Sequence, residues 1–581
     1  MQRSILVLLV LALAASVAWA SKGVRTASAR PVPFVEQVPA GPEKEYPPYA
    51  GERRESLVGT PTTLEGWYDY QSNGGGVQQI RTDPATGYIH VTYMLSEDSS
   101  SVSDSRRTGY AYSTDAGLTW NNFSNVRVPA RRSGFPTLDI GRGPIAGATI
   151  ISNHAIVIGT NNTTIVLVDY PPGQGVFSEL GSQGPPAGGE PIWPQVAAGS
   201  DGSIITHSTI NSTTLTQVNY LQRTVDLISW SLWLNVPGPN GSGGRGPVAS
   251  TASGKVGALV WSSDPSPRGL GLWESTNNGA SWPTAPVEIY PPERIVGGET
   301  LGVWVGHDIT YDASNNALIA MNTSRQSPTG FFYAGSRIEF WSQATGFVTA
   351  VPWDSSLYPS LMVAQSNHLA LGYPALALSG SRIVLAYQAF LSDTSSIDTS
   401  TGRHFGDIFY VQSTNGGLTW SSPVNLTNTP QMDERYPSIS KWNPDGYAYV
   451  TWQEDTRAGS HAFNDEAEKS LSRLMFYRID LNATGAPGEK PSGPSEFRLG
   501  HNYPNPFNPS TTIRFRIAER SEVRLAVFNT LGQEVAVLAS GTREPGEYAV
   551  DFSAGNLPSG VYYYTLRAGA RSAARSMLLL K

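Results

Sequence analysis

The chain has 581 residues and no cysteine, with a formal net charge of −7 and a hydrophobic fraction of 40%. The lack of cysteine excludes a disulfide framework, a thiolate metal site, a cysteine nucleophile and a lipidated cysteine anchor. The acidic balance without a Lys/Arg cluster excludes a nucleic-acid partner. The 59 glycines, 42 prolines, 26 tyrosines and 15 tryptophans indicate an almost all-β chain of short strands and tight turns.

The N-terminal segment predicts export. Arg3 precedes an apolar run from Ile5 to Ala18 that is too short to span a bilayer and ends on Ala18-Trp19-Ala20. We therefore expect a signal peptide over residues 1–20 and no transmembrane segment after its cleavage. Residues 21–60 are proline-rich and predict an extended leader.

A loose repeat follows between about residue 76 and residue 481. An apolar phrase recurs seven times at a spacing of roughly forty to sixty residues, which is typical of four-stranded propeller blades. The copies are Gly87–Tyr93, His154–Gly159, Ser203–His207, Lys255–Trp261, Asn316–Met321, Arg382–Tyr387 and Tyr447–Trp452. We interpret them as inner strands of a β-propeller over residues 61–481, with seven blades, or six if one weaker copy is an insertion. Asn464–Arg473 is the best candidate for a helix.

Three segments share the pattern S-x-[DN]-x-G-x-[TS]-W. The pattern positions are Ser113, Asp115, Gly117 and Trp120; Ser275, Asn277, Gly279 and Trp282; and Ser413, Asn415, Gly417 and Trp420. Here an Asp or Asn side chain accepts backbone N–H groups across a turn, Gly supplies positive φ and Trp packs over the hairpin. The pattern resembles the Asp-box (BNR repeat) of sialidase-like β-propellers. We expect a structural role for all three boxes.

The resemblance to sialidase-like propellers implies a glycosidase set at the axial mouth: an arginine triad, a Tyr–Glu nucleophile pair and an Asp acid/base. The usual entry motif, Phe/Tyr-Arg-Ile-Pro, is absent, and no candidates form a recognisable constellation. The candidate arginines and carboxylates are Arg81, Arg435, Arg457, Glu299, Glu434 and Glu454. The catalytic residues, if any exist, stay unknown.

An aromatic residue followed by proline introduces four of the expected inner strands. These pairs begin at Phe135, Trp193, Tyr373 and Tyr436, and His307 with Asp308 falls near the matching position of another copy. Residues before the inner strands converge around the propeller axis. They are candidates, together with Arg435, for stacking on a sugar or on a partner's side chain. The alternative is that the rings wedge between neighbouring blades.

Two carboxylate-bearing loops raise the alternative of a calcium ion. The first runs from Ser392 to Asp398 and on to Asp407, and the second contains Glu97, Asp98 and Asp104. Neither has the spacing of a calcium motif, so we expect solvated loops, no metal and no cofactor.

Residues 482–495 are rich in proline and glycine and predict a linker. Residues 496–581 open with Asn502-Tyr503-Pro504-Asn505-Pro506-Phe507-Asn508-Pro509 and continue into an alternating strand, Ile513–Ile517. With Leu531–Val535 and Leu557–Tyr562, this segment resembles the type A C-terminal sorting domain of the type IX secretion system. The resemblance implies a small immunoglobulin-like β-sandwich that engages the secretion machinery. It also implies passage through the periplasm to the outer cell surface or beyond.

Two function classes stay open. The first is an exported, monomeric propeller that binds a glycan or a surface protein at its axial mouth without catalysis. The second is a carbohydrate-active hydrolase, such as a sialidase-like glycosidase, that uses carboxylates in the central pocket.

Overall fold

The fold was analysed in a computed structural model of the whole chain. It describes residues 28–29, 58–72, 76–121, 127–158, 161–170, 175–180, 190–211, 218–236, 248–261, 269–291, 294–327, 330–363, 365, 367–483, 498–503, 505–517, 520–530, 532–544, 546–569 and 571–580. The expected signal peptide, nearly all of the leader and most of the linker lie outside these residues. The chain divides into two compact units, Met1–Gly488 and Glu489–Lys581.

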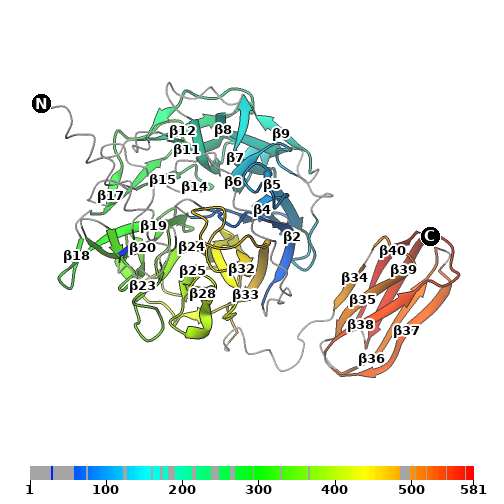
Figure 1. Cartoon of the computed structure of the whole chain (residues 1–581). Helices are drawn as coiled ribbons and strands as arrows, with labels where there is room; N and C mark the ends of the chain where they lie inside the picture. The colour runs from blue at the N-terminus through cyan, green and yellow to red at the C-terminus, as the bar shows by residue number, and fades with distance from the viewer. Residues whose placement is uncertain are drawn as a thin grey trace, which may run out of the picture. The chain divides into compact units, whose positions relative to one another are not determined.

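Seven mainly antiparallel sheets are arranged in a ring in the first unit, as far as the described residues extend (Figure 1). An eighth, two-stranded sheet pairs β26 (Ile397–Asp398) with β27 (Arg403–His404). Blade one comprises β3 (Ile80–Thr82), β4 (Ile89–Ser96) and β5 (Arg106–Ser113). Blade two comprises β6 (Ser133–Ile140), β7 (Thr149–Ile158), β8 (Asn161–Asp169) and β9 (Phe177–Leu180). Blade three comprises β10 (Glu190–Ala198), β11 (Ile204–Asn211), β12 (Val218–Thr224) and β13 (Leu234–Asn235). The fourth comprises β14 (Val248–Ser250), β15 (Val256–Trp261), β16 (Leu270–Ser275) and β17 (Val287–Tyr290).

The last three blades carry additions. Blade five comprises β19 (Glu299–Tyr311), β20 (Ala317–Ser327), β22 (Arg337–Ser342) and β23 (Gly346–Val351), extended by β18 (Arg294–Val296), β21 (Gly330–Phe332) and β1 (Ser28–Ala29). Blade six comprises β24 (Leu371–Ser379), β25 (Arg382–Phe390), β28 (Gly406–Ser413) and β29 (Val424–Asn425), with β31 (Trp442–Asn443) beside β24. Blade seven comprises β30 (Asp433–Ile439), β32 (Tyr447–Asp455), β33 (Ser472–Asp480) and β2 (Thr60–Gly66).

The β-propeller predicted from the sequence is therefore confirmed, with seven blades. The seven apolar phrases, however, fall on the second strand of each blade and not on the innermost one. The first strands are β3, β6, β10, β14, β19, β24 and β30. Of these, β3 and β14 have only three residues each, and the other five contain a register shift that breaks the apolar phrase. The regular second strands are buried from both sides by neighbouring blades, which explains their continuous apolar runs.

The ring closes through its N-terminal strand. Strand β2 pairs with β33, with Thr60 opposite Phe476 and Gly66 opposite Ser472. Thr62 Oγ1 also donates a hydrogen bond to the Leu474 carbonyl at 3.0 Å. The first and last parts of the propeller thus share one sheet, which leaves no open edge between them.

The three box segments adopt the same hydrogen-bonded turn. Ser113 Oγ accepts from the Gly117 amide at 2.8 Å, and Asp115 Oδ1 accepts from the Thr119 amide at 2.8 Å. In the other two boxes the Asn oxygen takes this role: Asn277 accepts from the Ser281 amide at 2.9 Å, and Asn415 from the Thr419 amide at 3.0 Å. The change from Asp to Asn therefore keeps the acceptor that closes the turn.

Two of the boxes pack on aromatic rings of an adjacent blade. Gly117 has φ +86°, and a Cβ there would lie 1.9 Å from the Phe476 ring; at Gly417, with φ +92°, it would lie 2.1 Å from Phe340. The box tryptophan Trp120 meets the same Phe476 ring edge-on, with centroids 5.2 Å apart. Only glycine allows this close approach, so these turns join blades to one another.

Helix is scarce in the described residues, which hold two short 3₁₀ helices, η1 (Gly143–Ile145) and η2 (Thr394–Ser396). The helix expected at Asn464–Arg473 is wrong: the segment is turn and irregular chain until β33 begins at Ser472. Asn464 and Asp465 both have positive φ, which a helix excludes. No helix among the described residues is long and apolar enough to cross a membrane.

The second unit is the expected β-sandwich. One sheet contains β34 (Arg498–Tyr503), β35 (Ser510–Ile517) and β38 (Gly546–Ser553); the other contains β37 (Glu534–Arg543), β36 (Ser521–Phe528), β39 (Gly560–Ala568) and β40 (Arg571–Leu579). The Asn502 amide donates to Tyr564 Oη at 3.0 Å, and the buried Phe507 bonds backbone to backbone with Leu578 at 3.0 Å. The proline-rich entry motif therefore ties the two sheets together.

Candidate functional site

The four aromatic–proline pairs lie inside the innermost strands and not just before them. Each pair coincides with a break in strand register in β6, β10, β24 or β30. The aromatic residue has positive φ in every case: 50° at Phe135, 51° at Trp193, 50° at Tyr373 and 55° at Tyr436. Bulky residues rarely adopt this conformation. The four aromatic residues therefore share the same β-bulge, which changes the direction in which the aromatic side chain points.

Side chains of the preceding blade hold three of these bulges. The Phe135 amide donates to Met94 Sδ at 3.1 Å, the Trp193 amide to His154 Nδ1 at 3.2 Å and the Tyr436 amide to Gln388 Oε1 at 3.3 Å. Each acceptor lies on the second strand of its blade. The bulges are thus supported by contacts between blades.

The four rings form two pairs joined through Tyr70. Phe135 meets Trp193 with centroids 6.4 Å apart, and Tyr373 meets Tyr436 at 5.1 Å. Tyr70, from the connector between β2 and β3, lies 6.5 Å from Phe135 and 6.1 Å from Tyr436. The exposed fractions are 5% for Phe135, 2% for Trp193, 2% for Tyr373 and 0% for Tyr436. The rings therefore form a buried aromatic cluster rather than an open platform.

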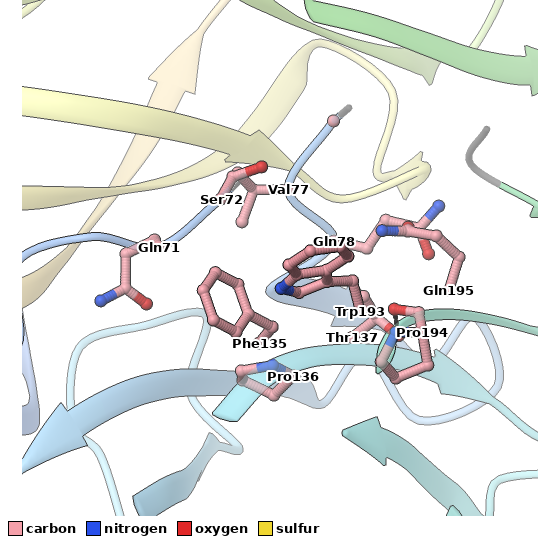
Figure 2. A pocket seen from close by; sticks show the side chains of 11 residues that line it. Gln71, Ser72, Val77, Gln78, Phe135, Pro136, Thr137, Trp193, Pro194 and Gln195 are labelled. Carbon is pink, nitrogen blue, oxygen red and sulfur yellow. Dashed lines mark hydrogen bonds between the residues drawn. The ribbon is translucent and has the colours of Figure 1, made fainter. Parts of the chain in front are cut away.

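A pocket lies beside the Phe135–Trp193 pair, between the β2–β3 connector and the second and third blades (Figure 2). Its enclosed space is about 20 Å³, room for about one water molecule, and the rest of the depression is open to solvent. Side chains from the β2–β3 connector, from β6 and from β10 surround it: Gln71, Ser72, Gly76, Val77, Gln78, Phe135, Pro136, Thr137, Trp193, Pro194 and Gln195. None of these described lining residues is ionisable. The pocket therefore offers aromatic edges, amides and hydroxyls.

Hydrogen bonds fix several of the polar groups in this pocket. Gln71 Nε2 donates to the Met94 carbonyl at 2.8 Å, and its Oε1 accepts from Gln79 Nε2 at 2.9 Å. Thr137 Oγ1 donates to the Pro194 carbonyl at 3.3 Å. Gln195 Oε1 is buried and has no hydrogen-bond partner among the described residues. This oxygen is an acceptor that is open to a water molecule or to a ligand group.

His307 and Asp308 do not line this pocket. Asp308, on β19, accepts from the Leu376 amide at 2.7 Å and forms an ion pair with Lys441 Nζ. Burial lowers the pKa of Lys441, while the Asp308 carboxylate opposes this shift. His307 is fully buried, with its ring 6.1 Å from that of Trp261. Asp308 therefore connects neighbouring blades, as Asp139 does by accepting from the Ala198 amide at 2.8 Å.

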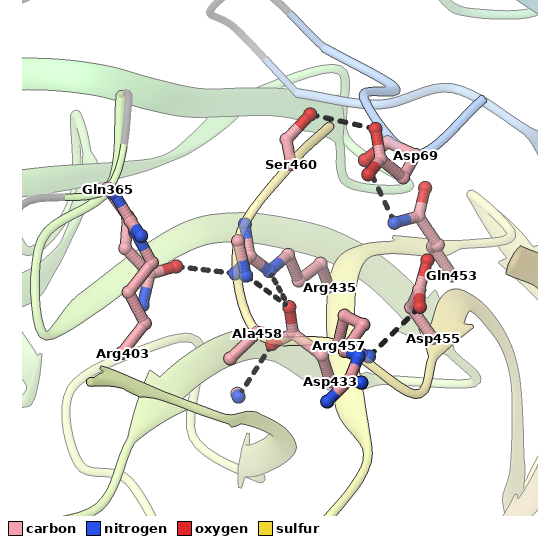
Figure 3. Close-up of polar contacts among 12 residues, drawn as sticks. Asp69, Gln365, Arg403, Asp433, Arg435, Gln453, Asp455, Arg457, Ala458 and Ser460 are labelled. Atoms are coloured by element: carbon pink, nitrogen blue, oxygen red, sulfur yellow. Dashed lines mark hydrogen bonds and ion pairs between the residues drawn. The ribbon is translucent and has the colours of Figure 1, made fainter. Parts of the chain in front are cut away.

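Arg435 lies in a second, charged region formed by blades six and seven (Figure 3). Its Nε is 2.6 Å from Asp433 Oδ2, its Nη2 donates to Gln365 Oε1, and its side chain is 1% exposed. Asp433 also accepts from the amides of Gly406 at 2.9 Å and Gly459 at 3.3 Å. The guanidinium is thus buried and paired with the Asp433 carboxylate.

The loop between β32 and β33, residues 456–471 (loop 456–471 below), covers this region. Asp69 holds it by accepting from Ser460 Oγ at 2.8 Å and from the His461 and Ala462 amides at 2.5 and 3.0 Å. Phe463, in the same loop, stacks on Tyr70 at 4.5 Å with an interplanar angle of 8°. Loop 456–471 therefore packs over the aromatic cluster.

Two buried carboxyls in blade seven have strongly shifted acidity. Burial raises the pKa of Asp455 to about 7, and the nearby Asp69 carboxylate adds to the shift. Burial also raises the pKa of Glu434 well above its ordinary value, reinforced by Asp407 and Glu454. Glu454 is in turn paired with Arg473, whose Nε lies 2.7 Å from it. Burial and the acidic neighbours of Glu434 therefore both favour its protonated form.

Three carboxylates of the two candidate calcium loops accept hydrogen bonds within their own turns. Asp393 accepts from the Ser395 amide at 2.9 Å, Asp398 from the Ser400 amide at 2.9 Å and Asp98 from the Ser100 amide at 2.8 Å. Across the described residues, no cluster of three or more His, Cys, Asp or Glu side chains could hold a metal ion.

The sequence reasoning missed Tyr70, Phe463 and the glutamines around the pocket. Gln195 follows Trp193-Pro194 directly, so its position relative to the aromatic–proline pair was the available signal. Tyr70 and Phe463 carry no such signal, because they meet only when the ring closes.

Comparison with known proteins identifies the C-terminal part. Residues 501–579 match the family described as secretion system C-terminal sorting domain. This confirms the predicted type IX sorting domain, which engages the secretion machinery and directs the chain to the cell surface or the exterior. Among curated proteins, none matches this sequence significantly.

Solved structures resemble the chain only distantly. A protein of unknown function from Dyadobacter fermentans has 13% identity and a TM-score of 0.36, covering 60% of this chain and 95% of its own. The α-L-arabinanase of Penicillium chrysogenum has 13% identity and a TM-score of 0.39, with coverages of 74% and 99%. The α-L-arabinofuranosidase of Fusarium graminearum has 13% and 0.36, with coverages of 73% and 98%. Likenesses of this size transfer neither substrate nor activity.

Proposed function

We propose that this chain is an exported β-propeller that binds a glycan beside its axis without catalysing a reaction on it. The observation that carries the proposal is the pocket between Phe135, Trp193 and Gln195, whose described lining is aromatic, amide and hydroxyl in character. Sugars are bound by such surfaces, because ring edges and faces contact C–H groups while amides pair with hydroxyls.

The position of the carboxylates favours binding over hydrolysis. A glycosidase of the usual kind places two carboxyl groups about 5–10 Å apart across the scissile bond. Here Asp69, Asp433 and Asp308 are engaged by backbone amides or cations, as described above. None of them is among the described residues that line the pocket.

Hydrolysis is the second candidate, and one observation favours it. The pKa of Asp455 is raised to about 7 by burial, and such a carboxyl is suited to donate a proton at neutral pH. Its Oδ2 has no hydrogen-bond partner among the described residues. Catalysis would require loop 456–471 to move, since that loop packs over this region.

The test measures binding of the protein to polysaccharides and hydrolysis of those polysaccharides in the same samples. Mature full-length protein is passed over immobilised cell-surface polysaccharides, and released reducing ends are assayed in the same mixtures. Retention without release supports a binding protein. Release of reducing ends that disappears in Asp455→Asn establishes the hydrolase instead, and capture of a surface protein with no glycan retained identifies a protein partner.

We extend the proposal to the domain organisation. Residues 61–481 are the functional cargo, residues 496–581 are the sorting domain, and residues 482–495 are the linker that joins them. Residues 1–20 are removed as a signal peptide. The functional chain is a monomer on this view, because the ring closes on its own N-terminal strand.

A further inference from the structure

A larger groove lies away from the aromatic cluster, between blades three and four. Leu234 and Asn235 of β13 form one wall, and Trp273, Trp282 and Thr284 of the β16–β17 hairpin form the other. The groove has a space of about 390 Å³, which is within the ~300–1,000 Å³ found for ligand pockets. None of the described residues that line it is ionisable. We call it the blade three–four groove.

The groove borders the tryptophan of the second box, which differs from the other two boxes in what packs beside it. In the first and third boxes the tryptophan meets a phenylalanine of an adjacent blade, as Trp120 meets Phe476 and Trp420 meets Phe340. Trp282 meets Trp273 of its own blade instead, with centroids 4.6 Å apart. The blade-three side chains next to Gly279 of this box are Ile205 and Arg223, neither of which is aromatic. Among the described residues, the second box therefore lacks the aromatic contact between blades.

The hairpin itself holds the two tryptophans of the groove in place. Trp282 Nε1 donates to the Gly279 carbonyl at 3.1 Å, and Trp273 Nε1 donates to the Pro283 carbonyl at 2.8 Å. Trp273 is 2% exposed and so lies at the base of the groove, whereas Trp282 is half-buried. Because both indole N–H groups are already satisfied, the rings offer a ligand their apolar surface. A surface that is ordered in advance loses little conformational entropy when a ligand binds.

The polar groups beside this apolar surface are an amide and a hydroxyl. Asn235 and Thr284 are both exposed, and neither side chain forms a hydrogen bond to another described residue. Ring surface next to uncharged hydrogen-bonding groups suits a sugar, whose C–H groups contact the ring while its hydroxyls pair with the amide and the hydroxyl. An acidic sugar would gain no ion pair from these residues. The lining therefore favours a neutral saccharide.

The short edge of β13 disfavours an extended peptide as the ligand. β13 has two residues, Leu234 and Asn235, and they pair with Leu221 and Tyr220 on one side. A peptide that adds to a sheet edge depends on successive main-chain hydrogen bonds along that edge. A strand of two residues offers too few of them.

We infer that the blade three–four groove is a binding site for a neutral saccharide, with a sugar ring against Trp282 and its hydroxyls paired with Asn235 and Thr284. The site is separate from the pocket beside Phe135 and Trp193. The inference therefore goes beyond the proposed binding at the axis.

The experiment measures binding of full-length mature protein to an array of neutral oligosaccharides of hexose or pentose units and to matched oligosaccharides that contain uronic acids. Trp282→Ala removes the ring, and Trp420→Ala is its matched control, because Trp420 has the same position in the third box and the same indole hydrogen bond to a glycine carbonyl at 3.1 Å. Asn235→Leu removes the amide. Its control is Leu232→Ser, at an 81% exposed side chain just before β13 and outside the groove. Gln195→Met reports binding at the axial pocket, and melting temperatures report folding.

We expect the wild type to bind neutral oligosaccharides. Affinity should fall at least about tenfold in Trp282→Ala, as for loss of a central aromatic contact, and about three- to tenfold in Asn235→Leu, as for loss of one hydrogen bond. Trp420→Ala and Leu232→Ser should bind like the wild type.

Several outcomes would overturn the inference. Saccharide binding that is unchanged in both groove variants does so, and if it falls in Gln195→Met instead, the proposed binding at the axis stands. Equal losses in Trp282→Ala and Trp420→Ala, or a preference for acidic oligosaccharides, also overturn it. A wild type that binds no saccharide but captures a protein, with capture lost in Leu232→Ser, has a protein-binding surface here instead. If Trp282→Ala fails to fold, Asn235→Leu decides.

Discussion

The same positive-φ aromatic bulge occurs in two regions of the propeller, with different surroundings in each. Around Phe135 and Trp193, the bulged aromatic residues border a pocket whose described lining residues are all uncharged, and the buried Arg106 guanidinium lies 5.5 Å from the centroid of the Phe135 ring. Around Tyr436, the same bulge is flanked by Arg435 and Asp433, and loop 456–471 lies over it. Buried charges need hydrogen-bonding partners from every side, and the covering loop supplies them. The pocket beside Phe135 and Trp193 thus has an uncharged described lining, whereas loop 456–471 covers the charged region around Tyr436.

We expect one of the two largest losses of stability in Trp193→Ala, in the neutral region. Trp193 is 2% exposed and packs on Phe135, so its removal leaves a cavity that should lower the free energy of unfolding by about 3–5 kcal/mol. Chemical denaturation measures this, and glycan binding should be lost as well. A loss of binding with an unchanged denaturation midpoint would show that Trp193 is an exposed platform and that the burial argument fails.

The charged region predicts a loss of the same order in Arg435→Met. The substitution leaves the buried Asp433 carboxylate without its cation, which costs about 3–5 kcal/mol. Combining it with Asp433→Asn removes both charges and should recover much of the stability. A double variant as unstable as the single one would show that the pair acts mainly through its contacts to Gly406, Gly459 and Gln365.

The sequence predicted the propeller and its blades better than the burial of the candidate site residues. The seven phrases were recognisable because each second strand is packed on both sides, and the aromatic–proline pairs because they repeat. Burial of the rings was not predictable, since the residues that cover them, Tyr70 and Phe463, are almost 400 positions apart and meet only through ring closure. Gln195 was overlooked although its position directly after Trp193-Pro194 could have marked it.

The acidity of Asp455 predicts a pH-dependent effect of about 2–4 kcal/mol. Its folded pKa of about 7 lies above the ordinary value of 3.8, so the folded state binds this proton more tightly than the unfolded state. The free energy of unfolding therefore falls as pH rises from about 4 to 7 and is constant above that range. Asp455→Asn should abolish this part of the slope.

Denaturation of both proteins across that pH range isolates the contribution of Asp455, because other carboxyls titrate equally in each. The variant should be the more stable protein at pH 8 and approach the wild type at pH 4. Parallel curves would show that Asp455 is solvated, and loop 456–471 would then not seal the charged region.

The smallest expected effect separates the two tyrosines that meet in the aromatic cluster. Tyr436 Oη is buried without a hydrogen-bond partner among the described residues, whereas Tyr70 Oη accepts from Asn367 Nδ2 at 2.8 Å. Tyr436→Phe should therefore be neutral or stabilising by up to about 1 kcal/mol, while Tyr70→Phe should lose about 0.5–1.5 kcal/mol. Thermal denaturation of the two matched variants compares them directly. If Tyr436→Phe is the more damaging, its hydroxyl has a partner such as bound water, and the covered half of the axis contains a polar space like that beside Trp193.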